Sequence, residues 1–358
     1  MINVTKTYLP PLDEYVEYLQ KIWKSGFVTN RSPFVLELEQ KIKTYLGVKN
    51  MLFVNNGTIA LQIAIKSLDL QGEIITTPFS YVATTTAILW ENCEPVFVDI
   101  EPDTFCIDAH KIEASITSKT SAILATHVYG YPCNVIKIAE IAKKYKLKVI
   151  YDAAHAFGIE VEGQSIFNFG DISTTSFHAT KLFHTIEGGG IFCNDDELFR
   201  KITLAHQFGH FHDDYYQVGV NGKVSEFHAA MGLCNLERIH DFITTRNKLI
   251  AMYDKQLAFL PIQRPKINSD FKYNGAYYPV VFESEEVLLA VKHALNQEQI
   301  FPRRYFYPSL NTVPYLKKQQ PCEISEDIAK KVLCLPLFYE LELSEIEKIT
   351  HIINQTLC

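Results

Sequence analysis

The sequence predicts an α/β fold built on a mostly parallel sheet. Short apolar segments rich in β-branched residues, typical of buried strands, alternate with amphipathic helical segments over roughly the first 240 residues. Ligands of open α/β sheets bind beyond the carboxyl ends of the strands, so polar residues that follow strands are the candidate site residues. The main strands are expected at residues 51–54, 73–77, 95–99, 121–127, 148–152, 172–176 and 190–193.

Length and composition indicate two domains and an acidic protein. The chain has 358 residues, 47% of them hydrophobic, and a formal net charge of −7. No long basic run is present, so nucleic acid is not an expected partner. We expect a large domain over residues 1–240, with its N-terminal segment packed on a smaller α+β domain over residues 241–358.

The sequence shows no signal peptide, no membrane span and no paired cysteine motif, and these features bear on the cellular compartment. No basic region followed by an apolar stretch opens the chain, and no apolar run approaches the ~18 residues of a membrane span. Eight scattered cysteines without a CxxC pair are typical of free thiols in a reducing compartment. We therefore expect a cytoplasmic protein that does not enter the membrane.

Three histidines, His206, His210 and His212, fall in a segment that we expect to be a mobile loop. No scaffold of carboxylates that could support metal ligands is evident around them. We therefore predict no metal site.

An anion site is indicated where the first strand of the sheet meets its helix. The turn Asn55-Asn-Gly57-Thr58 places backbone N–H groups and the positive end of a helix dipole at Gly57 and Thr58. The alternative is an ordinary helix cap. After the next strand, Tyr81 could stack on a flat heteroaromatic ring, or it could pack as a core tyrosine.

The strand expected at residues 148–152 ends in a carboxylate. Asp152 is followed by Ala-Ala-His155-Ala-Phe-Gly158, so both polar side chains lie at the edge where ligands bind. The alternatives are that Asp152 caps a helix and that His155 is a hydrogen-bonded interior histidine.

One lysine follows the strand expected at residues 172–176. The neighbouring Ser173, Thr175 and Phe177 are uncharged, so Lys181 lies at the mouth of a neutral layer. A lysine held there loses hydration, its pKa falls, and its amine becomes a nucleophile for an aldehyde. The alternative is a solvated lysine, which is the usual state of this residue type.

Ser176-Phe-His-Ala-Thr-Lys181, with the Glu187-Gly-Gly that follows, resembles the cofactor-lysine motif of the DegT/DnrJ/StrS family of nucleotide-sugar aminotransferases. The resemblance implies the type I, aspartate aminotransferase-like fold and the cofactor pyridoxal 5'-phosphate. It implies that Lys181 binds the cofactor covalently and that Ser176 binds its phosphate. Family members with His in place of this lysine catalyse dehydration, so the lysine favours amino transfer.

The resemblance assigns roles to the other strand-end residues. Gly57 and Thr58 match the family's phosphate site, and Tyr81 matches the aromatic that stacks on the pyridine ring. Asp152 matches the carboxylate that pairs with the ring nitrogen and makes the ring a strong electron sink. His155 matches the residue that bonds near the phenolic oxygen.

The segment from Gly219 to Glu226 resembles the family's G-x-N-x-K-M-x-E segment. In the family, that asparagine reaches the cofactor phosphate of the neighbouring subunit. Asn221 therefore implies a homodimer with shared active sites. The alternative is a polar turn ahead of a helix.

Two further segments resemble substrate-binding parts of the family. The turn ending in Thr29 and Asn30 resembles the family's early "SGWLT" turn, although a polar turn between helices is the alternative. Arg303, Arg304 and Tyr307 lie in a string that resembles the late segment near the sugar nucleotide. Paired guanidinium groups suit a diphosphate, with a solvated surface role as the alternative for at least one of them.

The resemblance implies transfer of an amino group from L-glutamate to a nucleotide-linked keto-sugar. The opening Val4-Thr-Lys-Thr-Tyr-Leu-Pro-Pro-Leu12 is most similar to the subgroup that converts dTDP-4-keto-6-deoxy-D-glucose to dTDP-4-amino-4,6-dideoxy-D-glucose, for O-antigen or another surface polysaccharide. Two alternatives stay open: a C3-specific enzyme acting on a dTDP-3-keto-6-deoxyhexose, and a non-catalytic sugar-nucleotide-binding regulator. A nicotinamide-dependent oxidoreductase is disfavoured, because no G-x-G-x-x-G follows the early strands.

Overall fold

A seven-stranded sheet organises the first two thirds of the chain in the order β2-β10-β9-β6-β5-β3-β4. In this computed structural model, residues 1–266 and 271–357 are described. Strand β10 pairs antiparallel with both neighbours, and the other pairs are parallel. The predicted mostly parallel α/β sheet is therefore confirmed. Its strands are β2 (Asn50–Val54), β3 (Glu73–Thr76), β4 (Glu94–Phe97), β5 (Thr120–Thr126), β6 (Lys148–Asp152), β9 (Ile172–Ser176) and β10 (Gly189–Cys193).

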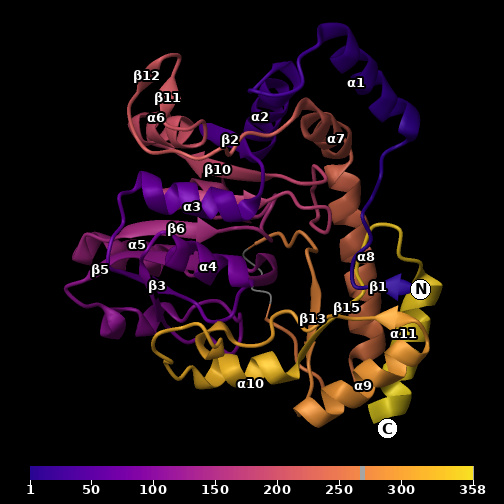
Figure 1. Cartoon of the computed structure of the whole chain (residues 1–358). Helices are drawn as coiled ribbons and strands as arrows, with labels where there is room; N and C mark the ends of the chain where they lie inside the picture. Colours follow the sequence, from indigo (N-terminus) through magenta and orange to yellow (C-terminus); the bar gives the residue numbers. More distant parts are fainter. Residues whose placement is uncertain (267–270, 358) are drawn as a thin grey trace.

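Helices cover both faces of this sheet (Figure 1). Successive side chains of a strand point to opposite faces, so Leu52 and Val54 join one apolar cluster while Met51 and Phe53 join the other. The first face is covered by α3 (Gly57–Ser67), α4 (Val82–Trp90) and α6 (Asp196–Ala205), and the second by α2 (Pro33–Leu46) and α5 (Val135–Tyr145).

Two parts of this region differ from the sequence-based expectation. Helix α4 was not predicted, since its three successive threonines have low helix propensity; burial of its apolar face against α3 stabilises it. The segment expected to be a mobile loop contains a short hairpin, β11 (His210–Phe211) with β12 (Asp214–Tyr215). The other short elements are β7 (Glu160–Val161), β8 (Gln164–Ser165) and the 3-10 turns Ala109–Lys111, Glu113–Ser115, Val128–Gly130, Ile166–Asn168 and Leu310–Thr312.

The C-terminal part packs around a second, two-stranded sheet. Strands β13 (Tyr278–Val281) and β15 (Val332–Leu335) pair antiparallel. At the N-terminus, β1 (Ile2–Asn3) pairs with β14 (Ile300–Phe301), so the start of the chain packs on its C-terminal part (Figure 1). The domain boundary near residue 240 stays a prediction. The helices of the remaining chain are α1 (Leu12–Ser25), α7 (Glu226–Leu236), α8 (Ile239–Leu257), α9 (Glu285–Gln297), α10 (Glu323–Lys331) and α11 (Leu343–Leu357).

Two global features concern membrane-spanning helices and disulfide bonds. Within residues 1–266 and 271–357, no helix has the length and apolar character needed to cross a bilayer. The seven cysteines in the described part of the chain are buried and form no disulfide with one another.

Candidate active site

Lys181 and Asp152 meet at the carboxyl edge of the sheet. Asp152 ends β6 and Ser176 ends the adjacent parallel strand β9, and Lys181 lies five residues further along the chain. A small pocket is lined by His155, Ser176, Lys181 and Tyr277, among others. Burial lowers the pKa of the Lys181 amine, and the Asp152 carboxylate opposes that shift. A lowered pKa leaves more of the amine uncharged and nucleophilic.

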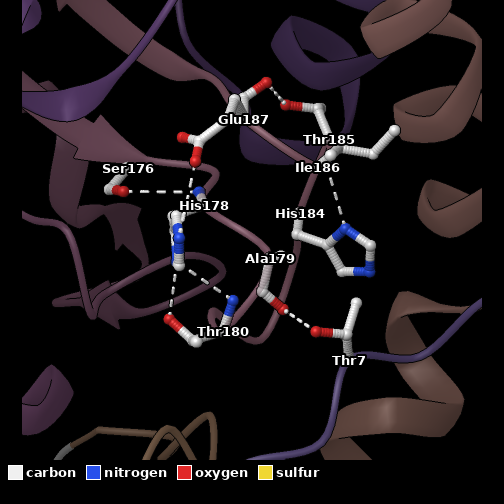
Figure 2. Close-up of polar contacts among 9 residues, drawn as sticks. All are labelled: Thr7, Ser176, His178, Ala179, Thr180, His184, Thr185, Ile186 and Glu187. Atoms are coloured by element: carbon white, nitrogen blue, oxygen red, sulfur yellow. Dashed lines mark hydrogen bonds and ion pairs between the residues drawn. The ribbon is translucent and has the colours of Figure 1, made fainter.

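The loop that carries Lys181 is held by polar contacts on both sides (Figure 2). The backbone N–H of Lys181 donates to the His178 carbonyl at 2.9 Å. The His178 ring lies 3.5 Å from a Glu187 carboxylate oxygen. On the other side, the Thr7 hydroxyl donates to the Ala179 carbonyl at 3.0 Å. The N-terminal segment and the loop into β10 together set the position of the lysine backbone.

Ser176 lies against the N-terminus of α3. A Cβ added to Gly57 would lie 2.9 Å from the Cβ of Ser176, so only glycine permits this approach. The Asn56 side chain caps the helix by accepting from the Ile59 N–H at 2.9 Å. This leaves the N–H groups of Gly57 and Thr58 with no protein acceptor in the described part of the chain, at the helix end that Ser176 contacts. A helix N-terminus with an adjacent hydroxyl is suited to a phosphate.

Asp152 is a buried carboxylate with two donors. Its side chain is 6% exposed; Oδ2 accepts from the Thr84 hydroxyl at 2.7 Å and Oδ1 accepts from the Ala154 N–H at 3.1 Å. Burial raises the pKa of Asp152, whereas the Thr84 hydroxyl, the Ala154 N–H and the Lys181 amine oppose that shift. The donors therefore favour the ionised form that burial disfavours.

His155 is held as a neutral ring. Its Nδ1 accepts from the Tyr129 N–H at 3.2 Å, which places the proton of the neutral tautomer on Nε2. Burial, and then the charge of Lys181, lower the pKa of His155 well below its ordinary value. The ring stacks on Phe306 with centroids 5.6 Å apart and planes 8° from parallel. Nε2–H is thus a donor of fixed direction at the edge of the site.

Aromatic residues surround the lysine. Tyr81 is 59% exposed at the start of α4, and its hydroxyl is close enough to Lys181 to oppose the lowering of the lysine pKa. Tyr305 acts on the pKa of Lys181 in the same direction. Tyr305, Phe306 and Thr84 were not identified from the sequence. Tyr305 and Phe306 lie between Arg304 and Tyr307, in the segment predicted to bind the sugar nucleotide, and Thr84 lies shortly after the end of a strand. Their positions in the sequence therefore gave only a weak indication of a role in the site.

The two predicted arginines differ in their surroundings. Arg304 makes an ion pair with Glu285 at 2.7 Å, and its guanidinium lies 3.5 Å from the ring centroid of Tyr307. Arg303 is exposed, lies 5.2 Å from the Tyr305 ring centroid, and has no ion pair within the described residues. The substrate role of Arg303, Arg304 and Tyr307 stays a prediction, and Arg303 has the more available donors.

The early turn and the Asn221 segment meet on the surface. The Thr29 hydroxyl donates to the Val224 carbonyl at 3.5 Å, and Asn30 is exposed in the left-handed region with φ 66°. Asn221 is exposed, and its backbone carbonyl accepts from the Asn55 side chain of the same chain at 3.2 Å. None of these predicted residues forms a hydrogen bond or ion pair with Lys181 in the part of the chain that is described.

Two of the three histidines considered as metal ligands have ring nitrogens close to backbone carbonyls, and the third, His212, supplies one of those carbonyls. His206 is buried with Nδ1 2.6 Å from the Thr203 carbonyl, and His210 has Nδ1 2.9 Å from the His212 carbonyl. Across residues 1–266 and 271–357, no group of three or more histidine, cysteine or acidic side chains is placed to hold a metal ion.

A lysine with a lowered pKa, a buried carboxylate and a helix N-terminus suited to an anion lie together at the carboxyl edge of a mostly parallel sheet, as in the type I pyridoxal-phosphate-dependent transferases. Residues 12–354 match the DegT/DnrJ/EryC1/StrS aminotransferase family, and the chain belongs to that family. The resemblance found in the sequence, and the fold that it implied, are thus confirmed. The protein is an aminotransferase, and the cofactor of its class is pyridoxal 5'-phosphate.

Individual relatives match over nearly their whole length. The chain is 43% identical to a dTDP-4-amino-4,6-dideoxy-D-glucose transaminase of Shigella dysenteriae, covering 99% of this chain and 98% of the relative. It is 39% identical to an Escherichia coli transaminase of the same name, covering 98% of each. The solved structure of DesI in the presence of its TDP-sugar product matches with a TM-score of 0.94 and 29% identity, covering 99% of this chain and 92% of that one.

Proposed function

We propose that the protein transfers the amino group of L-glutamate to C4 of dTDP-4-keto-6-deoxy-D-glucose, giving dTDP-4-amino-4,6-dideoxy-D-glucose. The observation that carries this proposal is the 43% identity, over almost all of both chains, to a transaminase named for that product. A second relative of the same name supports C4 rather than C3. A non-catalytic regulator is not favoured, because Lys181 is present and buried beside Asp152. The proposed setting is the cytoplasm, in synthesis of O-antigen or another surface polysaccharide.

The residues of the site fit pyridoxal 5'-phosphate. Its phosphate would be held at the N-terminus of α3 by Gly57, Thr58 and Ser176. The contact between Gly57 and Ser176 is so close that it leaves no room for a Cβ, and it brings the serine to this end of the helix. Asp152 would pair with the ring nitrogen and Nε2–H of His155 with the phenolic oxygen. When bound, the cofactor supplies an electron sink beside the carbon that exchanges a proton.

The protein's own groups account for the proton movements. Burial lowers the pKa of Lys181, which leaves more of its amine uncharged and able to act as a base. It takes the proton from Cα of glutamate and, in the second half of the reaction, delivers a proton to C4 of the sugar. Tyr81, exposed at the start of α4, would cover one face of the cofactor ring and limit the access of water.

Incubation of the cofactor-loaded protein with L-glutamate and dTDP-4-keto-6-deoxy-D-glucose tests the proposed reaction. We expect equimolar 2-oxoglutarate and 4-amino sugar nucleotide, both identified by NMR. A loaded protein that binds the sugar nucleotide but forms neither product would show a binding protein instead.

We also propose a homodimer in which Asn221 reaches the cofactor phosphate of the partner. Trp23 and Phe27, near the early turn, are 74% and 60% exposed, as expected for an apolar surface covered by a second subunit. Asn221→Asp places a carboxylate near a phosphate, and the two negative charges repel each other. When this variant is expressed without wild-type subunits, we therefore expect it to lose cofactor binding. The alternative is that the Asn221 side chain acts within its own subunit, in which its backbone carbonyl accepts from Asn55.

Co-expression separates the two arrangements. Subunits carrying Lys181→Ala and subunits carrying Asn221→Asp are each expected to be inactive. If sites are shared, hybrid dimers have one intact site, and roughly a quarter of wild-type activity returns, because about half of the dimers are hybrids. No recovery, with hybrid dimers demonstrated by differential tags, would place Asn221 in its own subunit.

The two neighbouring arginines provide a matched pair of variants. Arg303→Ala is expected to raise the KM for the sugar nucleotide about 10- to 100-fold, because a charge-assisted bond to the diphosphate is lost. Arg304→Ala removes the partly buried pair with Glu285 and is expected to lower the free energy of unfolding by about 1 kcal/mol with little change in KM. Steady-state kinetics and thermal unfolding are measured on both variants. An increase in KM confined to Arg304→Ala would show that Arg304, and not Arg303, binds the diphosphate.

A further inference from the structure

Three buried hydroxyl groups form a chain that ends on Asp152. The Thr126 hydroxyl donates to Ser80 Oγ at 3.0 Å, Ser80 Oγ lies 2.8 Å from Thr84 Oγ1, and Thr84 Oγ1 donates to Asp152 Oδ2 at 2.7 Å. All three hydroxyl residues are 1% exposed or less. The residues come from three elements: the end of β5, the loop after β3, and the first turn of α4.

The hydrogens in this chain can point in one direction only. An ionised carboxylate accepts and cannot donate, so the single hydrogen of Thr84 is directed to Asp152. The Thr84 oxygen then accepts from Ser80, and the Ser80 oxygen accepts from Thr126. Each donor is polarised by the one behind it, which strengthens the bond that reaches the carboxylate.

The folding of the sheet brings these residues together. Thr126 and Asp152 are directly paired across the parallel strands β5 and β6, and both lie at the carboxyl ends. Hydrogen bonding is not automatic for hydroxyls buried in this region. Thr76 and Thr85 are equally buried, yet their hydroxyl oxygens have no partner within the described residues.

We infer that Thr84, supported by Ser80 and Thr126, is a positioning residue that holds Asp152 as an oriented carboxylate toward the ring nitrogen of the cofactor. This inference rests on the proposed function of Asp152. A buried carboxylate without donors tends to protonate, and it would then lose its electrostatic preference for a protonated ring nitrogen. The geometry gives Asp152 a donor on each oxygen, and Thr84 is the one joined to a longer chain. Burial raises the pKa of Asp152, and Thr84 is the strongest of the groups that oppose this shift.

The test compares two ligands of the apoenzyme. Pyridoxal 5'-phosphate has the ring nitrogen, whereas 1-deazapyridoxal 5'-phosphate has carbon in its place. Thr84→Val keeps the side-chain shape and removes the hydroxyl. We expect it to weaken binding of the natural cofactor about 10- to 100-fold, the effect of a lost hydrogen bond to a charged group, and to leave binding of the analogue unchanged.

Thr85→Val is the matched control. It makes the same change at the next residue of α4, where the buried hydroxyl has no partner in the described structure, so both ligands should bind as in the wild type. Thr84→Ser is expected to restore the preference for the natural cofactor. If Thr84→Val does not fold, Ser80→Ala, one link further from Asp152, gives the same test with an expected weakening of about 3- to 10-fold.

Asp152→Asn separates failure of the inference from failure of the proposed function. The measured quantity is the preference of the apoenzyme for pyridoxal 5'-phosphate over the 1-deaza analogue. Loss of this preference in both Asp152→Asn and Thr84→Val, but not in Thr85→Val, supports the inference. Loss in Asp152→Asn alone, or equal weakening of both ligands by Thr84→Val, overturns the role of the hydroxyl chain. If Asp152→Asn keeps the preference, Asp152 does not face the ring nitrogen, and the inference is overturned with the proposed role.

Discussion

Replacing Lys181 with alanine is expected to lower the rate of amino transfer by roughly 10⁴-fold or more. The change removes the nucleophile and the acid/base group together, because the proposed mechanism assigns both roles to one amine. Its lowered pKa, caused by burial, suits both. The rate is measured as 2-oxoglutarate formed in a single turnover. In the wild type, borohydride should also attach the cofactor irreversibly to the peptide that contains Lys181, as detected by mass spectrometry.

Lys148→Ala is a suitable control for this experiment. Lys148 begins β6, whereas the site lies at the other end of that strand, and it makes an exposed ion pair with Asp171 at 2.9 Å. Exposed pairs contribute little, so activity should stay near the wild-type level. If Lys181→Ala retained substantial turnover, or if the label were found on another lysine, the assignment of the central residue would be wrong.

Asp152→Asn is expected to retain bound cofactor at saturating concentration but to react on the order of 10²-fold more slowly, or worse. That loss corresponds to about 3 kcal/mol of transition-state stabilisation. The physical reason is that a neutral amide does not keep the ring nitrogen protonated, so the electron sink is weaker. Single-turnover rates with glutamate give the measurement, and the absorbance of the bound cofactor confirms loading.

Asp171→Asn controls for loss of a carboxylate from the same sheet. Asp171 accepts from the Val149 N–H at 2.8 Å, near the starts of β6 and β9, whereas the candidate site lies at the carboxyl ends of these strands. Its removal can affect stability but should leave the single-turnover rate nearly unchanged. Near-normal turnover in Asp152→Asn would show that the reaction does not depend on this carboxylate.

The central strands were predictable because burial and β-branched composition agree there. Strands β6 and β9 begin and end at the predicted residues. In β6, charged residues flank an apolar run, and β9 follows Gly170-Asp171 and is rich in β-branched residues. Helix α4 could not be predicted in the same way. Its threonines favour extended structure locally, and contact with α3, which sequence periodicity does not reveal, decides the outcome.

The site divides along similar lines. Lys181, Asp152 and Ser176 could be proposed from the sequence, because each follows a strand and belongs to a recognisable motif. Thr84 could not, since its role depends on a contact 68 residues away along the chain. The different surroundings of Arg303 and Arg304 likewise depend on Glu285, a residue of another element. Local motifs therefore indicate the chemistry, and tertiary contacts identify the residues that support it.

The most direct test of the central claim is which carbon of the sugar receives the amine. The loaded enzyme is supplied with L-glutamate and either dTDP-4-keto-6-deoxy-D-glucose or its 3-keto isomer, and the products are identified by NMR. Both carbonyls are chemically similar, and a misplacement of about 1 Å can cost ~10²-fold, so the site's geometry should separate them clearly. We predict turnover of the 4-keto compound to the 4-amino sugar nucleotide, with the 3-keto isomer at least about 10²-fold slower. Turnover of the 3-keto isomer alone would contradict the C4 assignment.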